Sequence, residues 1–489
     1  MGDQNTILSE TEARHLLRKS GFGVTPKDLK KARIVGVTRG EAADKITNYK
    51  PKRLKPRGDD LQTVHDKWVK FLIKGKSSFQ SKLAYFWHDH FATAISTVQD
   101  GRRMADQITL LQDLAGGDMR TFVKAINKNP AMMEFLDTVR NNKEIPNENY
   151  ARELCELFTL GVFDEAGNEN YAQEDVVQIA RAFTGWRYDD KEVAFLRENR
   201  HDYMAEFPER GPKVLFDNVH GFGPGGADFA ANGEGEAEID TVVDILFQHT
   251  DTDAMNTVAR RTARRLLEFF AHGEPDVATI DQVVAASGFD TNFNVAGLCR
   301  EIFVHDAFYE TASLPPFGSS TKKSVKHPID FVVSTLRLLR MKPKGKELRI
   351  EGGTFNTLFN HVSNMGQTLV NPPSVFGWNW EVSWLSSATL LARYNFTRDI
   401  ASARDGGGRF KPEKIMDISL TNADDIVDAV TDVLGITDQL TTPERDALYD
   451  YLTDNGANTS LNLFDYDTRV VKLNGLFALA MQSPTYQVH

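Results

Sequence analysis

The sequence has very little cysteine and no long apolar run. Cys155 and Cys299 are the only two cysteines among 489 residues, and they do not form a CxxC spacing. This argues against a disulfide framework and against a thiolate metal site, so we expect two buried thiols. The apolar runs are far shorter than a membrane-spanning helix requires, and the sequence therefore predicts no membrane span.

Basic residues are outnumbered by acidic ones. The chain has 57 Lys and Arg against 68 Asp and Glu, a formal net charge of −11. Nucleic-acid binders that neutralise phosphates usually display a basic patch, so we expect no nucleic-acid partner. The densest basic cluster comprises Arg260, Arg261, Arg264 and Arg265. It lies among apolar residues at helical spacing, and we interpret it as a solvated helix face.

Several common motifs are missing. The chain contains no G-x-S-x-G elbow, H-E-x-x-H, EF-hand loop or dinucleotide fingerprint. The glycine-rich segment 217–235 lacks the P-loop order, so we interpret it as a surface loop. A chain of this length can bury a core without metals, and the sequence predicts no cofactor. The N-terminal segment lacks the basic and apolar regions of a secretory signal, which leaves a cytoplasmic protein or a removed signal.

Helical periodicity dominates the chain, whereas segments that alternate with period two are few and short. We therefore expect an all-α fold, a multi-helix globular body with very short strands. The predicted helices cover residues 11–19, 61–74, 79–93, 102–115, 119–128, 148–160, 173–184, 237–249, 252–271, 277–287, 294–305 and 328–340, and the predicted strands cover 213–216 and 348–351.

A glycine-rich stretch near the end of the chain predicts a domain boundary. Residues 404–415 include three consecutive glycines, and the helical pattern resumes at about residue 422. We expect a main helical domain at 1–403, a Gly-rich hinge at 404–421 and a C-terminal helical subdomain at 422–489 packed on the main body.

The first candidate site is the predicted helix after Asn147, which ends at Gly161. Asn149, Arg152, Glu153 and Glu156 are spaced i, i+3, i+4 and i+7, so they share one face. Two carboxylates beside an arginine could divide the roles of general acid and base. The alternative is a solvated face or an ion-pair network that ties helices together.

The second candidate is the aromatic-rich segment around His88 and His90. Residues two apart on a helix point about 200° apart, so these histidines would not bind one metal unless the helix ends there. One of them could be a catalytic base or a metal ligand, and the alternative is a pair of core histidines.

Two further segments carry aromatic residues in loops. Thr184, Gly185 and Trp186 close a predicted helix upstream of His201, and Trp378 belongs to a proline-fixed loop that begins at Asn371. Indoles on such loops could stack on a sugar ring or could be packing plugs. We expect the Trp378 loop to be largely buried, with one or two exposed indoles.

These segments resemble a known family. The runs NENYARELCELFTLGV and YAQEDVVQIARAFTGW, together with RHLLRKSGFG, FWHDHFAT, MGQTLVNPPSVFGW and ALAMQSPTYQ, are similar in order to segments of the bacterial family called Domain of Unknown Function 1800. The resemblance implies an exported bacterial protein, periplasmic or extracellular, often encoded beside a family that resembles sulfatases, with no established activity. It implies a shared site at His88, His90, Asn147, Glu148, Asn149, Arg152, Glu153, Glu156, Thr184, Gly185 and Trp186. Phe158 departs from the polar residue or histidine common at its position, so a metal site that relies on that residue would be absent.

Our leading hypothesis is a hydrolase or lyase that acts on an extracellular glycan or a small polyhydroxylated ligand. Glu153 or Glu156 would act as acid or base, Arg152 as an anion clamp, and His88 or His90 would assist. Substrate contacts would come from Asn147, Glu148, Asn149, Thr184, Trp186, His201 and Trp378. One alternative is a non-catalytic binding or assembly partner of a neighbouring exported enzyme, and another is a metalloprotein. The sequence leaves open whether the chain is an enzyme.

Overall fold

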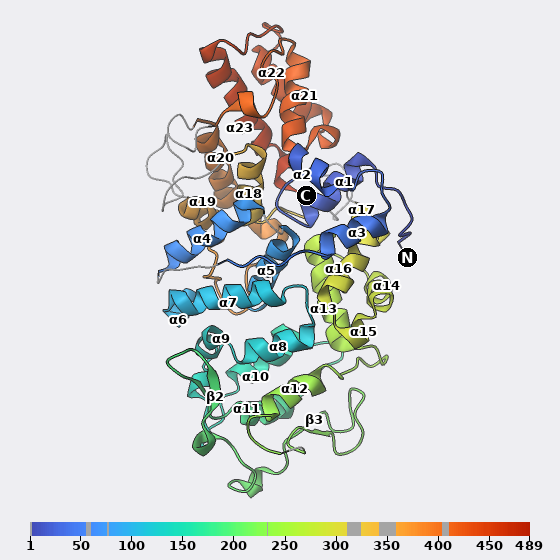
Figure 1. The fold of residues 1–489 in the computed structure, drawn as a ribbon, viewed down its shortest axis with the longest axis vertical. Helices are drawn as coiled ribbons and strands as arrows, with labels where there is room; N and C mark the ends of the chain where they lie inside the picture. The colour runs from blue at the N-terminus through green and yellow to red at the C-terminus, as the bar shows by residue number, and fades with distance from the viewer. Residues whose placement is uncertain are drawn as a thin grey trace.

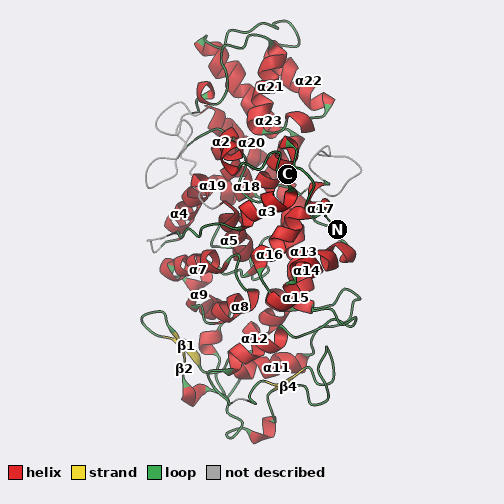
Figure 2. Ribbon diagram, turned by 45° about the vertical axis from the view of Figure 1, so that its right-hand side comes forward, coloured by secondary structure: helices red, strands yellow, loops and turns green. Residues whose placement is uncertain are grey.

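A computed structural model describes residues 2–54, 60–75, 78–231, 233–310, 324–341, 358–402 and 410–489. Helices make up most of the molecule (Figure 2), so the predicted all-α fold is confirmed. Within these ranges no helix is both long enough and apolar enough to cross a membrane. Both cysteines are free and buried, as predicted.

The strands of the described chain form two small antiparallel pairs. β1 (Trp186–Tyr188) pairs with β2 (Ala194–Leu196), and β3 (Val214–Leu215) pairs with β4 (Ala227–Asp228). β3 confirms the strand predicted at 213–216. The β1–β2 pair was not predicted, because three-residue strands are too short to show a period of two. The strand predicted at 348–351 lies outside the described residues.

Local capping explains where many helices begin and end. Ser9 and Glu12 form a capping box at α1 (Glu10–Lys19). The side chain of Asp60 caps α4 (Leu61–Lys74), which ends at Gly75 in the left-handed conformation. Both bounds of α4 agree with the sequence prediction.

The first half of the chain contains the aromatic-rich helix α5 and a series of other helices. These elements are α2 (Pro26–Ala32), α3 (Arg39–Thr47), α5 (Ser78–His90), α6 (Ile95–Val98), α7 (Gly101–Leu114), α8 (Met119–Asn127), α9 (Pro130–Phe135), α10 (Asn149–Glu153), the π-helix η2 (Leu154–Thr159), α11 (Gln173–Ala182) and α12 (Glu238–Leu246).

The second half begins with the helix that carries the four arginines, α13, and ends in a group of helices at one end of the elongated molecule (Figure 1). These elements are α13 (Thr257–Phe270), α14 (Val277–Ser287), α15 (Phe289–Asn292), α16 (Val295–Val304), α17 (Asp306–Tyr309), α18 (Pro328–Leu338), α19 (Leu358–Asn364), α20 (Ser387–Ser402), α21 (Ala423–Leu434), α22 (Thr442–Thr453), the π-helix η9 (Thr468–Leu473), α23 (Asn474–Gln482) and α24 (Pro484–Gln487).

Two hydrophobic clusters fill the interior. One joins α5, α8, α11, α13 and α16. The other joins α4 and α18 to the C-terminal helices, through residues such as Trp68, Phe331, Phe477 and Tyr486. Residues 404–409 of the expected hinge lie outside the described residues, and the division at 403 stays a prediction.

Candidate functional site

A cavity opens where the end of α5 meets α13 and the loop 371–380. Its volume is about 580 Å³. We call it the tryptophan–arginine cavity, and it is lined by Asp89, His90, Leu157, Arg261, Arg264, Arg265, Glu268, Gly273, Val375, Phe376, Trp378, Asn379 and Trp380. Two predicted site residues, His90 and Trp378, therefore meet in one place.

His88 and His90 point in different directions, as the helical geometry predicts. His88 is fully buried, and its Nε2 accepts the backbone N–H of Val370 at 2.9 Å. Its ring packs edge-on against Trp68 and Trp378, with centroids 5.0 and 5.5 Å away. Burial lowers the pKa of His88 to about 3, so the ring is neutral at pH 7. These contacts are those of a core histidine.

His90 is the last residue of α5 and lines the cavity. Its Nε2 lies 3.3 Å from the carbonyl oxygen of Phe158, an acceptor that requires the Nε2–H tautomer. Burial, and then the charges of Arg265 and Arg261, lower the pKa of His90 to about 3. The ring is therefore neutral at pH 7, and Nδ1 keeps its lone pair.

Asp89 holds the loop 371–380 against the end of α5. Its Oδ1 accepts the backbone N–H of Trp378 at 2.8 Å, and its Oδ2 accepts Nε1–H of Trp380 at 2.9 Å. Burial raises the pKa of Asp89 to about 6, although these hydrogen bonds and Arg265 oppose the shift. Gly377 adopts φ +76°, and a Cβ there would lie 2.4 Å from Asp89 Oδ1. Glycine therefore allows the close approach of loop and carboxylate.

The expected loop with one or two exposed indoles is not found: Pro373, Ser374, Phe376 and Asn379 are exposed, but none of the indoles is. Trp378 and Trp384 are 5% and 4% exposed, whereas Trp380 is half-buried at the cavity. Phe376 is the most exposed aromatic ring of the loop, at 65%. The loop thus offers a phenyl ring to solvent and keeps its indoles against the protein.

The interpretation of the four arginines as a solvated face is wrong. Arg260 is buried and bonds Asp281 at 2.7 Å and Asp251 at 3.0 Å. The other three line the tryptophan–arginine cavity. The apolar neighbours that suggested an amphipathic surface helix pack α13 into the core, and the arginine side is covered by η2 and by the loops at 165 and 375–380.

The predicted polar helix at 148–160 is α-helical only to Glu153 and continues as the π-helix η2. The wider π turns displace residues from α-helical spacing, so the face drawn through Glu156 does not extend past Glu153. Asn147 Oδ1 accepts the backbone N–H of Asn149 at 2.9 Å, and Gly161 takes φ +82° after the last turn. The end signal at Gly161 was therefore identified correctly, whereas the helix begins one residue later than predicted, with Glu148 and not Asn147 at the N-cap position.

The charged side chains of this segment lie outside the cavity lining. Arg152 bonds Glu148 at 3.0 Å, and both side chains are about one-third exposed or more. Burial and the neighbouring Glu156 raise the pKa of Glu153. Glu156 accepts the hydroxyl of Tyr171 at 3.3 Å, and its backbone carbonyl accepts Arg261 Nη2 at 2.7 Å. The Glu156 carbonyl is therefore the contact through which the predicted polar helix reaches a cavity residue.

Thr184 and His201 belong to a separate buried polar network. Trp186 is buried close by in the chain, but its Nε1–H has no hydrogen-bond partner among the described residues. Thr184 Oγ1 accepts the backbone N–H of Asp202 at 2.8 Å, and His201 Nδ1 lies 2.9 Å from the Thr184 carbonyl oxygen. Lys213 Nζ bonds Glu238 at 2.8 Å beside the His201 ring. All these side chains are buried, and their contacts tie loop 198–213 to α11 and α12.

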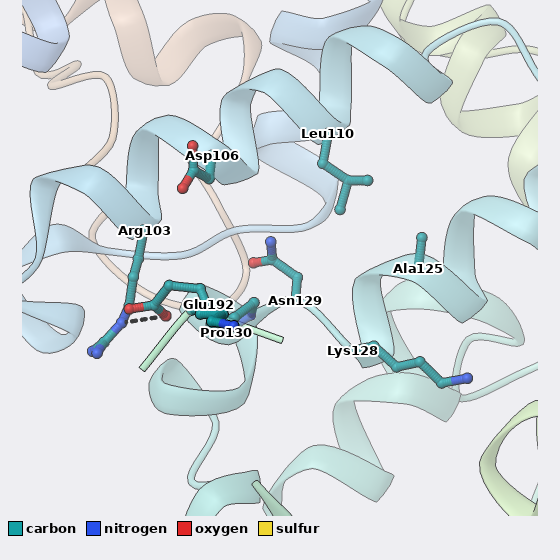
Figure 3. A pocket seen from close by; sticks show the side chains of 9 residues that line it. Arg103, Asp106, Leu110, Ala125, Lys128, Asn129, Pro130 and Glu192 are labelled. Atoms are coloured by element: carbon teal, nitrogen blue, oxygen red, sulfur yellow. Dashed lines mark hydrogen bonds and ion pairs between the residues drawn. The ribbon is translucent and has the colours of Figure 1, made fainter. Parts of the chain in front are cut away.

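A second cavity, of about 340 Å³, lies between α7 and α8 (Figure 3). Arg103 and Glu192 pair across it at 2.9 Å, while the side chain of Lys128 extends away from them (Figure 3). Lys128 Nζ lies 5.6 Å from the ring centre of Trp186, at the cation–π limit. Trp186 is itself buried, so the network around Thr184 does not open into this cavity.

A metal site built from three or more clustered histidine, cysteine or carboxylate side chains is not found in the described part of the chain. The metalloprotein hypothesis therefore has no ligand set there to support it.

Five cavity residues were not predicted from the sequence: Asp89, Arg261, Arg265, Phe376 and Trp380. One signal was present: two Arg-Arg pairs separated by two residues put Arg261 and Arg265 on one side of a helix whose other side is apolar. Arg261 and Arg265 are more than a hundred residues away from the loop at 376–380 in the sequence. Their proximity to that loop could therefore not be predicted.

Comparison with curated proteins and with solved structures finds no match to this chain. A family model does match, over residues 15–488, and its description reads "Protein of unknown function (DUF1800)". Because that match covers nearly the whole chain and includes every element of the cavity, the protein belongs to the DUF1800 family.

Proposed function

We propose that the protein binds a saccharide in the tryptophan–arginine cavity and acts on it as a hydrolase or lyase. One observation carries this proposal: a single open cavity brings together an exposed aromatic ring, a neutral histidine and arginine side chains. Concave sites with aromatic walls and a few convergent polar groups are typical of ligand-binding sites.

Phe376 provides the stacking surface. It stands 65% exposed on a loop that Pro372 and Pro373 stiffen and that Asp89 holds in place. A rigid aromatic ring at a rim can cover the apolar face of a sugar while losing little conformational entropy. Asn379, beside it in the lining, supplies an amide that can both donate and accept hydrogen bonds.

His90 is the cavity residue best suited to proton transfer. With Nε2–H directed to the Phe158 carbonyl, Nδ1 is the basic nitrogen. In a hydrolase it would take a proton from the water that attacks the anomeric carbon, and in a lyase from a carbon of the sugar ring. In both cases the glycosidic C–O bond breaks, and the protonated imidazole returns the proton to the leaving oxygen. The acid and base roles of Glu153 and Glu156 stay predictions, and they are tested in the same assay by Glu153→Gln and Glu156→Gln.

The experiment is calorimetric titration of the protein with a panel of neutral and acidic hexasaccharides. We expect binding by wild type and at least about tenfold weaker binding by Phe376→Ala, as loss of a stacking ring implies. Phe464→Ala is the matched control, since Phe464 is equally exposed at 65% but lies in a turn between α22 and η9, far along the chain from the cavity residues. Equal losses in both variants, or no binding to any saccharide, would refute the proposal.

Turnover is measured on each saccharide that binds. New reducing ends without ultraviolet absorbance indicate hydrolysis, and an absorbing unsaturated product indicates elimination. Loss of either product in His90→Gln, with binding retained, would support the role of His90. Binding without turnover would favour the predicted non-catalytic partner role instead.

A further inference from the structure

We infer that the saccharide carries a carboxylate, which Arg261 and Arg265 bind together as a two-guanidinium clamp. This inference rests on the proposed function, because it places the acidic group of that ligand in the same cavity. We choose Arg261 and Arg265 because these two of the three lining arginines are not fully neutralised by carboxylates of the protein, whereas Arg264 is.

Arg261 has no carboxylate partner among the residues that the structure describes. Its Nη2 donates to the Glu156 carbonyl at 2.7 Å, and its buried Nε has no hydrogen-bond acceptor. Across the described ranges, no carboxylate comes within 4.0 Å of its guanidinium. A partly desolvated cation without a counter-ion is costly, and a bound anion would remove that cost.

The position of Arg261 is fixed by a glycine. Gly161 has φ +82°, and a Cβ there would lie 2.5 Å from Arg261 Nη1. The guanidinium therefore rests against bare backbone at the end of η2. Burial, and then the nearby charge of Arg265, lower the pKa of Arg261 to about 10, so it remains charged at pH 7.

The guanidinium of Arg265 stacks on an indole, and its charge is only partly neutralised by carboxylates. Its guanidinium lies over the Trp380 ring, 4.2 Å from the centroid, and Nη1 bonds Glu268 at 3.0 Å. The other terminal nitrogen lies 3.9 Å from Asp89 Oδ2, too long for a hydrogen bond. A guanidinium stacked on an indole keeps its edge N–H groups available for a planar carboxylate.

Arg264, by contrast, is already satisfied. It bonds both carboxylate oxygens of Glu165 and also reaches the Pro275 carbonyl. The cavity lining thus holds three arginines against Asp89 and Glu268, an excess of positive charge on a protein of net charge −11. Local charge of that sign attracts and orients an acidic ligand.

The clamp also affects His90. The charges of Arg265 and Arg261 both lower the pKa of His90. A carboxylate seated on these arginines would offset their charge and raise the proton affinity of the imidazole. An acidic substrate would therefore make the neighbouring base stronger when it binds.

The test compares oligomers of galacturonate, glucuronate and mannuronate with their methyl esters, which differ only in the charged group. We expect at least one acid to bind about ten- to a hundred-fold more tightly than its ester, in line with hydrogen bonds to a charged partner. Arg265→Gln and Arg261→Gln should remove that preference while the ester still binds. Arg265→Lys should restore only part of it, because lysine cannot form the bidentate contact.

The matched control is Arg445→Gln. Arg445 is 35% exposed and paired with carboxylates, close to the 31% of Arg265, but it lies on α22. It should keep the full preference for the acid. Each variant is checked for wild-type circular dichroism and melting temperature before titration.

The possible failures separate the two claims. Equal binding of acid and ester by wild type would overturn the carboxylate clamp and leave the saccharide proposal standing. A preference that survives in both Arg261→Gln and Arg265→Gln would also overturn the clamp. Binding of neither acid nor ester would overturn both claims.

Discussion

Histidines two residues apart on one helix have opposite environments in this protein. His88 is enclosed by Trp68, Trp378 and the backbone of Val370, whereas His90 faces the cavity. The 100° turn per residue of an α-helix produces this separation. The more buried ring contributes to stability, and the partly exposed ring is placed for chemistry.

Acid should destabilise the protein through its buried histidines. Burial lowers the pKa of His88 to about 3, below the value of about 6.5 in the unfolded chain. The unfolded state therefore binds more protons between these values, and stability falls as pH decreases below 6.5. We expect His88→Gln to be less stable at pH 7.5. Lowering the pH from 7.5 to 5 should reduce the unfolding free energy of both proteins. The reduction should be about 2 kcal/mol smaller for His88→Gln than for wild type.

Chemical denaturation at the two pH values measures this difference. His305→Gln is the control: burial lowers the pKa of His305 as well, but this ring is only half-buried and bonds Gln282 at 3.1 Å, so its replacement should change the pH dependence less. An unchanged pH dependence in His88→Gln would show that His88 is not held neutral in the folded state.

Gly377 should tolerate no side chain. Alanine there would bring Cβ to 2.4 Å from Asp89 Oδ1 and 2.7 Å from its backbone oxygen, at φ +76°. Gly36→Ala is the matched control, since Gly36 has φ +73° with no atom within 4 Å of the added Cβ. Denaturant titration should show a loss of about 1 kcal/mol for the control, the cost of the left-handed conformation. Gly377→Ala should lose at least about 2 kcal/mol more, as for overpacking. Equal losses would mean that the loop is not held against Asp89.

At the scale of elements, the π-helix η2 forms one side of the cavity, through Leu157 and through the Glu156 carbonyl that binds Arg261. Its wider turn ends at Gly161, where the chain makes room for Arg261. The last carbonyl groups of a helix have no N–H partner within the helix. Here Asn170 provides the missing donor, because its Nδ2 donates to the carbonyl oxygens of Leu160 at 3.1 Å and Gly161 at 3.3 Å. A residue from the following loop therefore stabilises this helix end.

Asn170→Ala should loosen the end of η2. Asn170 is fully buried, so its removal leaves two buried carbonyls unsatisfied, and we expect a loss of about 2–3 kcal/mol. Asn292→Ala is the control, because the exposed Asn292 bonds the Ser287 carbonyl at the end of α14. Water can replace that bond, and the control should lose less than about 1 kcal/mol. Equal losses, measured by urea unfolding, would contradict this account.

At the scale of the whole molecule, the C-terminal helices share a core with the rest of the chain. The second hydrophobic cluster runs from α4 and α18 into α21–α24. Within it, the fully buried Asp330 pairs with Lys82 of α5 and accepts His489 Nε2 at 2.7 Å. Burial alone would raise the pKa of Asp330, but the charge of Lys82 and the hydrogen bonds from Lys82 and His489 hold it well below its usual range.

We therefore expect the main body and residues 422–489 to unfold together. Calorimetry should give one transition with equal calorimetric and van't Hoff enthalpies. Asp330→Asn should shift that whole transition to lower temperature, with a loss of about 3–5 kcal/mol from the unpaired Lys82. The control Asp424→Asn removes an exposed ion pair to Arg445 and should shift it much less. Two separate transitions would support an independent subdomain instead.

The sequence by itself determined the local structure and the family. Helical periodicity and caps such as Ser9, Asp60 and Gly161 depend on residues within a few positions of one another, so α1, α4 and the end of η2 could be predicted. The family follows from motifs that extend along the chain, and the family match over residues 15–488 confirms it.

Only the tertiary structure decided which of these residues share a site. Asp89 and Trp380 are 291 residues apart, and Arg265 reaches the Trp380 ring from a third element. No local pattern encodes such contacts, because they depend on how helices pack. For the same reason the sequence could not show that His88 lies in the core, that Arg152 lies outside the cavity, or that Arg261 lies within it beside Gly161.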